Sequence, residues 1–477
     1  MGCGSSQSLI QKKNTISLLN DPSCYLWKEY KSTYKNLSQT SSSKTHKLHY
    51  NNKTIEFEFT IVGEKPQEGY PLFICLHDGE VSHGAYNTGE YKKMKTYYLK
   101  SITNGICLAC RGISDQSNFH YMDESFVLIE KVIKEMIVLY DADPLRVYLL
   151  GVGLGGNGVY QLAARLPDRF AALSVNSGHT LGLNLKNLIN IPIQIQVGEN
   201  DIMFEKNKNA VNAFCTLCDL YKEYDIQTTT IECNIHTGKG KHIVDYNIKR
   251  AIQNVVNDPV AWLNAQEYTS IPKNTNAILF LSQFKRNSFP QKIVWDVTKC
   301  FRREPASDNF FQANKKMTLQ TIPTINFSTK SDLQMDATLS HLSGNSTVNN
   351  NKDMRVESSI SFSNCFCYWL ETGNKNINEI GAVEIIAHLD KENNKIVIET
   401  PVKYIRVLLC QDFIDFDREV TIEIGKESKS LKVMRNFATE RRCIAERGDY
   451  IFIFSAAVVI ESTDLVQFKI YQFAEQL

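Results

Sequence analysis

Residues 146–156, which read RVYLLGVGLGG, determine the fold that this sequence predicts. The first five residues are mostly apolar and rich in β-formers, which is typical of a short strand buried on both faces. A glycine-rich turn follows, and then a helical pattern. This order of strand, turn and helix is the setting of a nucleophile elbow, G-x-S-x-G, whose central serine attacks the substrate. The central residue here is Gly153, so the sequence predicts an elbow without its nucleophile.

The segments on both sides of this elbow alternate between strand and helix patterns. Helical patterns lie at 124–140, 160–165 and 206–221. Strand patterns lie at 54–62, 72–76, 105–109, 146–150, 171–176, 193–197 and 228–235. Strands separated by helices indicate an α/β fold with a doubly wound, mostly parallel sheet.

The remaining sequence divides the chain into four parts. Residues 1–45 are polar around one short apolar-aromatic stretch, 25–27, and predict a flexible N-terminal segment with at most one turn or helix. Residues 46–295 hold the α/β domain. Residues 296–364 form a Ser/Asn-rich insert of low complexity. Residues 365–477 contain short strand patterns parted by turns, with a helix near 434–446, and predict a small, sandwich-like β-rich module.

Composition excludes several classes of function. The 477 residues carry a net charge of +1, which disfavours nucleic-acid binding. The longest nearly uninterrupted apolar run, 451–460, is about half the length that crosses a bilayer, and no secretory leader pattern opens the chain. The thirteen cysteines lack zinc-type spacing. We therefore expect no membrane span, disulfide, metal site or cofactor.

The N-terminus matches an acylation pattern. Gly2 follows the initiating Met and a serine stands at position 6, which predicts N-myristoylation of Gly2. Cys3 is then the natural palmitoylation site, and Lys12 and Lys13 supply nearby positive charge. The predicted location is the cytosolic face of a membrane, with the acyl chains as the anchor. The alternative is a chance Met-Gly start on a frayed tail.

About three quarters of the chain resembles the α/β-hydrolases related to polyhydroxybutyrate depolymerases and feruloyl esterases. The matching segments are 71–77 (PLFICLH), 105–112 (GICLACRG), the elbow, 167–172 (PDRFAA), 196–201 (QVGEND), 236–242 (HTGKGKH) and 286–295 (RNSFPQKIVW). Segments 368–370 (YWL), 415–421 (DFDREVT) and 446–449 (ERGD) resemble the C-terminal β module of that group.

The resemblance implies the positions of a catalytic triad and an oxyanion hole. The acid would be Asp201 and the base His242, in the Ser-acid-His chain order of these enzymes. The backbone N–H of Leu154 would be one oxyanion donor. The loop after His77, where such enzymes often carry His-Gly-Gly-Gly, would supply the other.

That loop reads Asp78, Gly79 and Glu80 in this chain. The two carboxylates would oppose a developing negative charge, and we take this as a second departure, independent of Gly153.

Loss of the serine from a triad lowers turnover by roughly a millionfold, which predicts a pseudohydrolase that acts in binding or scaffolding. Its partners would be a membrane, a small molecule in the vestigial pocket, or another protein. One alternative is a hydrolase of the same fold that uses Cys107, Cys110 or an activated water. Another is a structural component of a membrane-associated assembly. His120 and His179 either line the pocket or are structural.

A phosphate-binding loop is disfavoured at the elbow because no Lys-Ser/Thr pair follows it.

Overall fold

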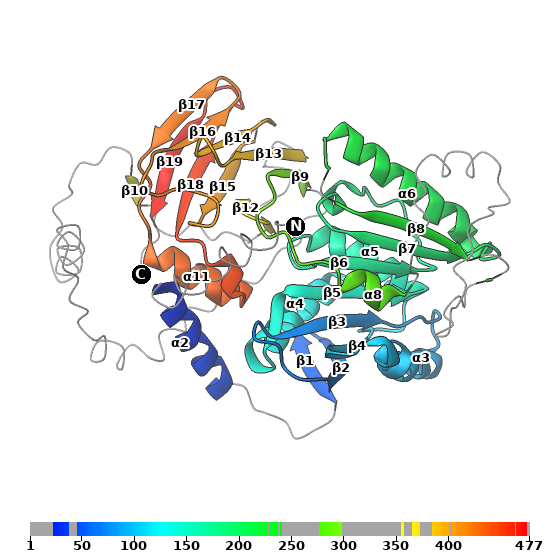
Figure 1. Ribbon diagram of the computed structural model, residues 1–477. Coiled ribbons are helices and arrows are strands. Elements are labelled where there is room, and N and C mark those ends of the chain that lie inside the picture. Colours follow the sequence, from blue (N-terminus) through cyan, green and yellow to red (C-terminus); the bar gives the residue numbers. More distant parts are fainter. Residues whose placement is uncertain are drawn as a thin grey trace, which may run out of the picture.

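The computed structural model describes ten stretches of the chain: residues 22–37, 45–227, 229–236, 239–240, 276–297, 354–356, 365–372, 384–400, 402–462 and 464–474. They form an α/β unit and a β-rich module, with helix α2 (Pro22–Leu37) beside both (Figure 1). Positions Gly2, Cys3 and His242, and most of the predicted insert, lie outside the described residues.

The α/β unit is built on an eight-stranded sheet. Its order is β1-β2-β4-β3-β5-β6-β7-β8, and all neighbours are parallel from β4 to β8. The strands are β1 (His46–Tyr50), β2 (Lys53–Val62), β3 (Tyr70–Leu76), β4 (Gly105–Arg111), β5 (Ala142–Val152), β6 (Ala172–Asn176), β7 (Ile193–Gly198) and β8 (Ile231–His236). This order is that of an α/β-hydrolase sheet, and the predicted fold class is confirmed.

Helices cover both faces of this sheet. One face carries α4 (Asp123–Leu139), α5 (Leu154–Arg165) and α6 (Lys206–Glu223). The other carries α3 (Gly84–Tyr97) and α8 (Ala277–Leu281). Strand β3 shows why both faces are apolar: Ile74 packs into the first core and Phe73 into the second, because successive side chains of a strand point to opposite faces. Short 3-10 turns are η1 (Leu99–Ser101), η2 (Lys186–Leu188) and η3 (Met203–Glu205).

The module consists of two sheets around one apolar core. The five-stranded sheet contains β9 (Lys292–Asp296), β13 (Glu384–Asp390), β14 (Lys395–Ile398), β16 (Val420–Ile424) and β17 (Glu427–Leu431). The six-stranded sheet contains β10 (Met354–Val356), β11 (Cys365–Cys367), β12 (Leu370–Thr372), β15 (Tyr404–Leu409), β18 (Ala456–Glu461) and β19 (Lys469–Ala474). The helical elements are α11 (Phe437–Arg447) and η7 (Tyr450–Phe452).

All but the last residue of strand β9 lie inside the range 46–295 expected for the α/β domain, yet the strand pairs with β13 of the module.

Buried charges connect the module to the α/β unit. Arg169, which precedes β6, binds Glu130 of α4 at 2.7 Å and Asp449 of the module at 3.2 Å. Arg447 of α11 binds Asp168 at 2.8 Å. All five side chains are buried or nearly so, so each depends on its partners to offset the cost of desolvation.

Helix α2 packs where the two units meet. Leu26 and Tyr30 are buried, and they cluster with Val138 of the α4 helix and Ile444 of α11. The residues before β1 were expected to be flexible with at most one turn or helix, and this stretch is a sixteen-residue helix. No helix among the described residues combines the length and apolarity needed to cross a membrane.

Candidate functional site

The elbow lies at the carboxyl end of β5. Gly153 joins β5 to α5 with φ of 59° and ψ of −118°. Its N–H donates to the Asn176 carbonyl at 2.9 Å, and its carbonyl accepts from the Asn157 N–H at 3.1 Å. This left-handed backbone conformation is strained for any residue with a side chain, and glycine at position 153 avoids that strain.

Asp78 fills the position that an oxyanion would take. Its Oδ1 accepts a hydrogen bond from the Leu154 N–H at 3.0 Å, at the N-terminus of α5. Backbone N–H groups at a helix N-terminus favour an anion. In an active enzyme the charge that develops in the transition state would occupy such a place, but here a buried carboxylate of the chain itself already occupies it.

The same carboxylate takes the space of a serine side chain. A Cβ built at residue 153 would lie 2.7 Å from Asp78 Oδ2 and closer still to Oδ1 and Cγ. Carbon atoms do not approach that closely, so a serine at position 153 requires Asp78 to leave the Leu154 N–H. The expectation that Gly153 and Asp78 are independent departures is wrong, because the Asp78 carboxylate fits only where residue 153 has no side chain.

Buried aromatic rings fix the loop that carries Asp78. The Gly112 N–H donates to His77 Nε2 at 3.0 Å, so Nδ1 carries the proton and donates to the Asp78 carbonyl. Burial lowers the pKa of His77 to about 4, which keeps the ring neutral. The ring stacks on Phe119, with centroids 5.1 Å apart. His120 Nε2 donates to the His77 carbonyl at 2.9 Å.

The next two residues of the loop have different roles. Gly79 is packed so closely that a Cβ would lie 2.8 Å from the Phe119 ring. Glu80 does not reach the oxyanion position, contrary to expectation. Its carboxylate is half exposed and faces His83 at 3.6 Å, because the backbone of Glu80 is tied to the Asn87 side chain by two hydrogen bonds. Of the Asp78 and Glu80 carboxylates, only that of Asp78 therefore lies at the oxyanion position.

The acid position lies at the end of β7, two strands from the elbow in the sheet order. Asp201 is buried, its N–H donates to the Gly198 carbonyl at 3.0 Å, and its carbonyl accepts from the Asn207 N–H at 3.1 Å. Its Oδ2 is buried and has no hydrogen-bond donor among the residues that the structure describes. Because His242 lies outside those residues, a contact between acid and base stays a prediction.

Three other histidines are accounted for by hydrogen bonds. His120 is a buried structural residue, as its bond to the His77 carbonyl shows. His236 ends strand β8, and its Nε2 bonds to Gln196 Oε1 at 3.1 Å. Burial lowers the pKa of His236 to about 4. His179 lies after β6, where its Nδ1 accepts from the Leu181 N–H at 2.8 Å.

Neither cysteine considered as a substitute nucleophile is suited to attack. Cys107 and Cys110 are buried within strand β4, 2% and 0% exposed. Burial raises the pKa of the Cys110 thiol, which favours the unreactive protonated form. No group of three or more potential metal-ligating side chains occurs in the described part of the chain. These residues therefore offer a fixed carboxylate on a helix N-terminus, and the elbow contributes no nucleophile.

Several solved esterase and depolymerase structures are similar to part of this chain. A thermostable esterase is 17% identical over 51% of this chain, with a TM-score of 0.36, and the match spans 63% of the esterase. A poly(3-hydroxybutyrate) depolymerase from Bordetella parapertussis is 14% identical over 40% of this chain and 80% of its own, with a TM-score of 0.33. An acetyl xylan esterase from Aspergillus awamori is 14% identical over 42% of this chain and 94% of its own, with a TM-score of 0.31.

No protein-family model matches the chain, and no curated protein is similar to it. At these identities the structural likeness concerns the fold alone, so function must be argued from the site.

Proposed function

We propose that this protein is a catalytically inactive α/β-hydrolase-like protein that acts in binding or scaffolding at the cytosolic face of a membrane. The observation that carries the inactivity is the Asp78 carboxylate, which accepts from the Leu154 N–H and occupies the space beside Gly153. One residue thus opposes both requirements of acyl transfer, an attacking side chain and an empty oxyanion hole.

Magnitudes support this proposal. Removing the nucleophile of a triad lowers turnover by roughly a millionfold, and what remains comes from substrate binding and the oxyanion hole. Removing one oxyanion-hole donor lowers turnover by a further 10²–10³-fold or so. In this chain the Leu154 N–H is already engaged, and a fixed negative charge faces any tetrahedral oxyanion. We therefore expect no residual hydrolysis above that of an unrelated protein.

The membrane location rests on the N-terminal sequence. Gly2, Cys3 and Ser6 match the acylation pattern, and two acyl chains hold a protein stably where one gives only marginal binding. The retained fold would then present its vestigial pocket, or the module, to a small molecule or a protein partner.

Hydrolysis of a panel of short-chain aryl esters tests the inactivity. The wild-type chain and His242→Ala, which removes the predicted base, are compared at equal concentration. We expect equal rates at background level. Turnover by the wild type that His242→Ala abolishes would instead reveal an active enzyme. A covalent trap would then label the protein if it uses another nucleophile, and would leave it unlabelled if it uses an activated water.

A further inference from the structure

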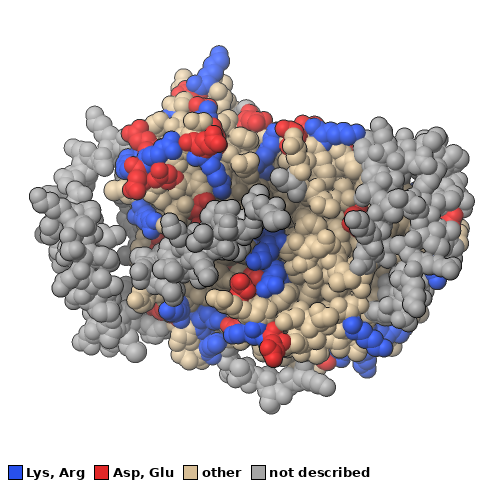
Figure 2. All heavy atoms as spheres, in the orientation of Figure 1, with Lys and Arg blue, Asp and Glu red and all other residues tan. Residues whose placement is uncertain are grey.

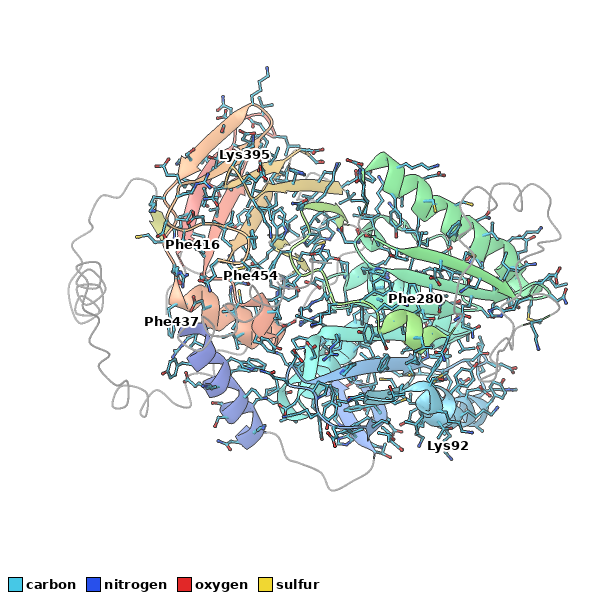
Figure 3. All side chains as sticks on the ribbon, viewed as in Figure 1. Lys92, Phe280, Lys395, Phe416, Phe437 and Phe454 are labelled. Atoms are coloured by element: carbon cyan, nitrogen blue, oxygen red, sulfur yellow. The ribbon has the colours of Figure 1, made fainter. Side chains whose placement is uncertain are left out.

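Two exposed aromatic side chains lie where α2 meets α11. Tyr25 is 60% exposed and Phe437 is 44% exposed, although both belong to well-packed helices. Figure 3 shows Phe437 where α11 approaches one end of α2. The Arg441 guanidinium lies 4.9 Å from the centre of the Phe437 ring and 3.9 Å from the carboxylate of Glu29 on α2. These contacts join the two helices into one continuous surface.

We call this the α2 surface; its members are Tyr25, Lys28, Glu29 and Lys35 of α2, which recur at the three- to seven-residue spacing of one helix face, and Phe437 and Arg441 of α11. The Lys28 ammonium group lies 5.8 Å from the centre of the Tyr25 ring, so a basic group and an aromatic ring share the exposed side of the helix. Scattered apolar residues are normal on protein surfaces, but aromatic rings interleaved with cations are typical of segments that lie in a membrane interface.

Positive charge predominates in the N-terminal part of the sequence, which includes α2. Residues 1–55 contain eight lysines, no arginine and two acidic residues, a net charge of +6, whereas the whole chain carries +1. The other 422 residues therefore carry −5. Figure 2 shows Lys and Arg side chains over the lower left of the molecule, where Figure 1 places α2. Residues 1–37, from the acylation motif to the end of α2, hold five of these lysines and both acidic residues, a net charge of +3, and the Lys31 ammonium group is paired with Asp141.

We propose that the α2 surface binds the anionic face of a lipid bilayer. The proposal rests on the membrane location given above, and it names the surface that would face the membrane. Residues 1–21 connect the predicted acyl sites directly to Pro22. A basic residue near an anionic membrane contributes about 1 kcal/mol, and aromatic rings favour the headgroup region. The acyl chains and this surface would therefore contact the same bilayer.

This orientation turns the vestigial site away from the lipid. Figure 1 shows α2 at one end of the molecule and the carboxyl ends of β7 and β8 at the other. Helix α2 is also packed against both α4 and α11, so the orientation of the helix fixes that of the two units. A partner at the carboxyl edge of the sheet would consequently bind from the cytosol.

A second exposed apolar group supplies a matched control. Ile202, Met203 and Phe204 are 70%, 67% and 76% exposed and follow strand β7 at the carboxyl edge. Here charge is balanced, since Lys208 binds Glu205 at 3.2 Å. This group has the apolar exposure of the α2 surface without its excess of positive charge.

The test is sedimentation of the full chain with vesicles of phosphatidylcholine alone or mixed with phosphatidylserine. The chain carries Gly2→Ala so that no acyl chain contributes. We expect binding only to the anionic vesicles, weakening as salt rises. The double variant Lys28→Glu/Lys35→Glu should bind at least about 25-fold more weakly, since each lysine lost accounts for about fivefold. Tyr25→Ser/Phe437→Ser should also bind more weakly, with helix content unchanged.

The control variants Phe204→Ser and Lys208→Glu should bind like the parent chain. Equal binding by the α2-surface variants and the parent, or no binding to anionic vesicles at all, would overturn the proposal. Acylation is measured separately: the wild-type chain is co-expressed with an N-myristoyltransferase, and its mass shows whether Gly2 is myristoylated. Failure of the surface and failure of the acyl anchor are therefore distinguishable.

Discussion

The contact between Asp78 and residue 153 predicts a specific coupling between two substitutions. Gly153→Ser places a side chain on a left-handed backbone, which costs about 1–3 kcal/mol, and displaces Asp78 from the Leu154 N–H. A hydrogen bond to a charged group contributes about 1.5–3 kcal/mol. The single variant should therefore lose about 2.5–6 kcal/mol in free energy of unfolding.

Asp78→Ala alone should lose about 1.5–3 kcal/mol, because it removes the same hydrogen bond and leaves the Leu154 N–H without its acceptor. The double variant has already lost that bond, so adding the serine costs only the backbone strain. The double variant should thus be more stable than the sum of the single effects predicts, by about 1.5–3 kcal/mol.

Urea unfolding of the four proteins measures this coupling. Asp78→Asn is the matched control. The asparagine side chain has nearly the volume of aspartate and keeps a carbonyl oxygen that accepts from the Leu154 N–H, so its clash with a serine at position 153 should remain. A coupling within about 0.5 kcal/mol of zero for Asp78→Ala, or an equal coupling for Asp78→Asn, would refute the steric account.

Three further predictions concern stability. Burial lowers the pKa of His77 from 6.5 to about 4, so the neutral ring contributes about 3 kcal/mol to the free energy of unfolding above pH 6.5, and this contribution is lost as pH falls toward 4. Urea unfolding should show that the stability of His77→Asn depends less on pH than that of the wild type. An equal pH dependence would contradict this prediction. Asp449→Ala removes one carboxylate partner from each of two buried guanidinium groups, Arg169 and Arg286, and should cost about 3–5 kcal/mol in free energy of unfolding. The control Glu423→Ala, at the half-buried pair of Glu423 with Lys395, should cost at most about 1 kcal/mol in the same measurement. Tyr30→Ala removes a buried ring that packs between α2, α4 and α11 and should lower the free energy of unfolding by about 3–5 kcal/mol. A thermal midpoint equal to that of the wild type would show that α2 does not hold the two units together.

Much of the fold could be predicted because its signals are local. Short apolar runs separated by helical periodicity defined the parallel sheet, and the strand-turn-helix around Gly153 is present as expected. Two features escaped local reasoning. The pairing of β9 with β13 joins residues about ninety positions apart, and no pattern within 292–296 indicates which sheet it joins. The second feature is the length of α2: the sequence predicted one turn or helix at most in this segment, whereas Leu26 and Tyr30 pack on distant helices and stabilise sixteen helical residues.

Three of the predicted site positions come together in the structure, but how they interact was not predicted. Gly153, Asp201 and the loop of Asp78 all lie at the carboxyl edge of the sheet, as motif order suggested. What the sequence could not show is that the Asp78 carboxylate reaches the Leu154 N–H, because this contact depends on how two strands align across the sheet. A signal was available: an acidic residue in the oxyanion loop coincides with glycine at the nucleophile position.

Aryl-ester hydrolysis by four proteins tests most directly the claim that Asp78 keeps the site inactive. These are the wild type, Gly153→Ser, Asp78→Ala and the double variant Asp78→Ala/Gly153→Ser. The account predicts that the double variant hydrolyses the ester and that Gly153→Ser is much slower, because the displaced Asp78 carboxylate of Gly153→Ser still places a negative charge beside the developing oxyanion. Turnover by the wild type, or equal turnover by Gly153→Ser and the double variant, would contradict it.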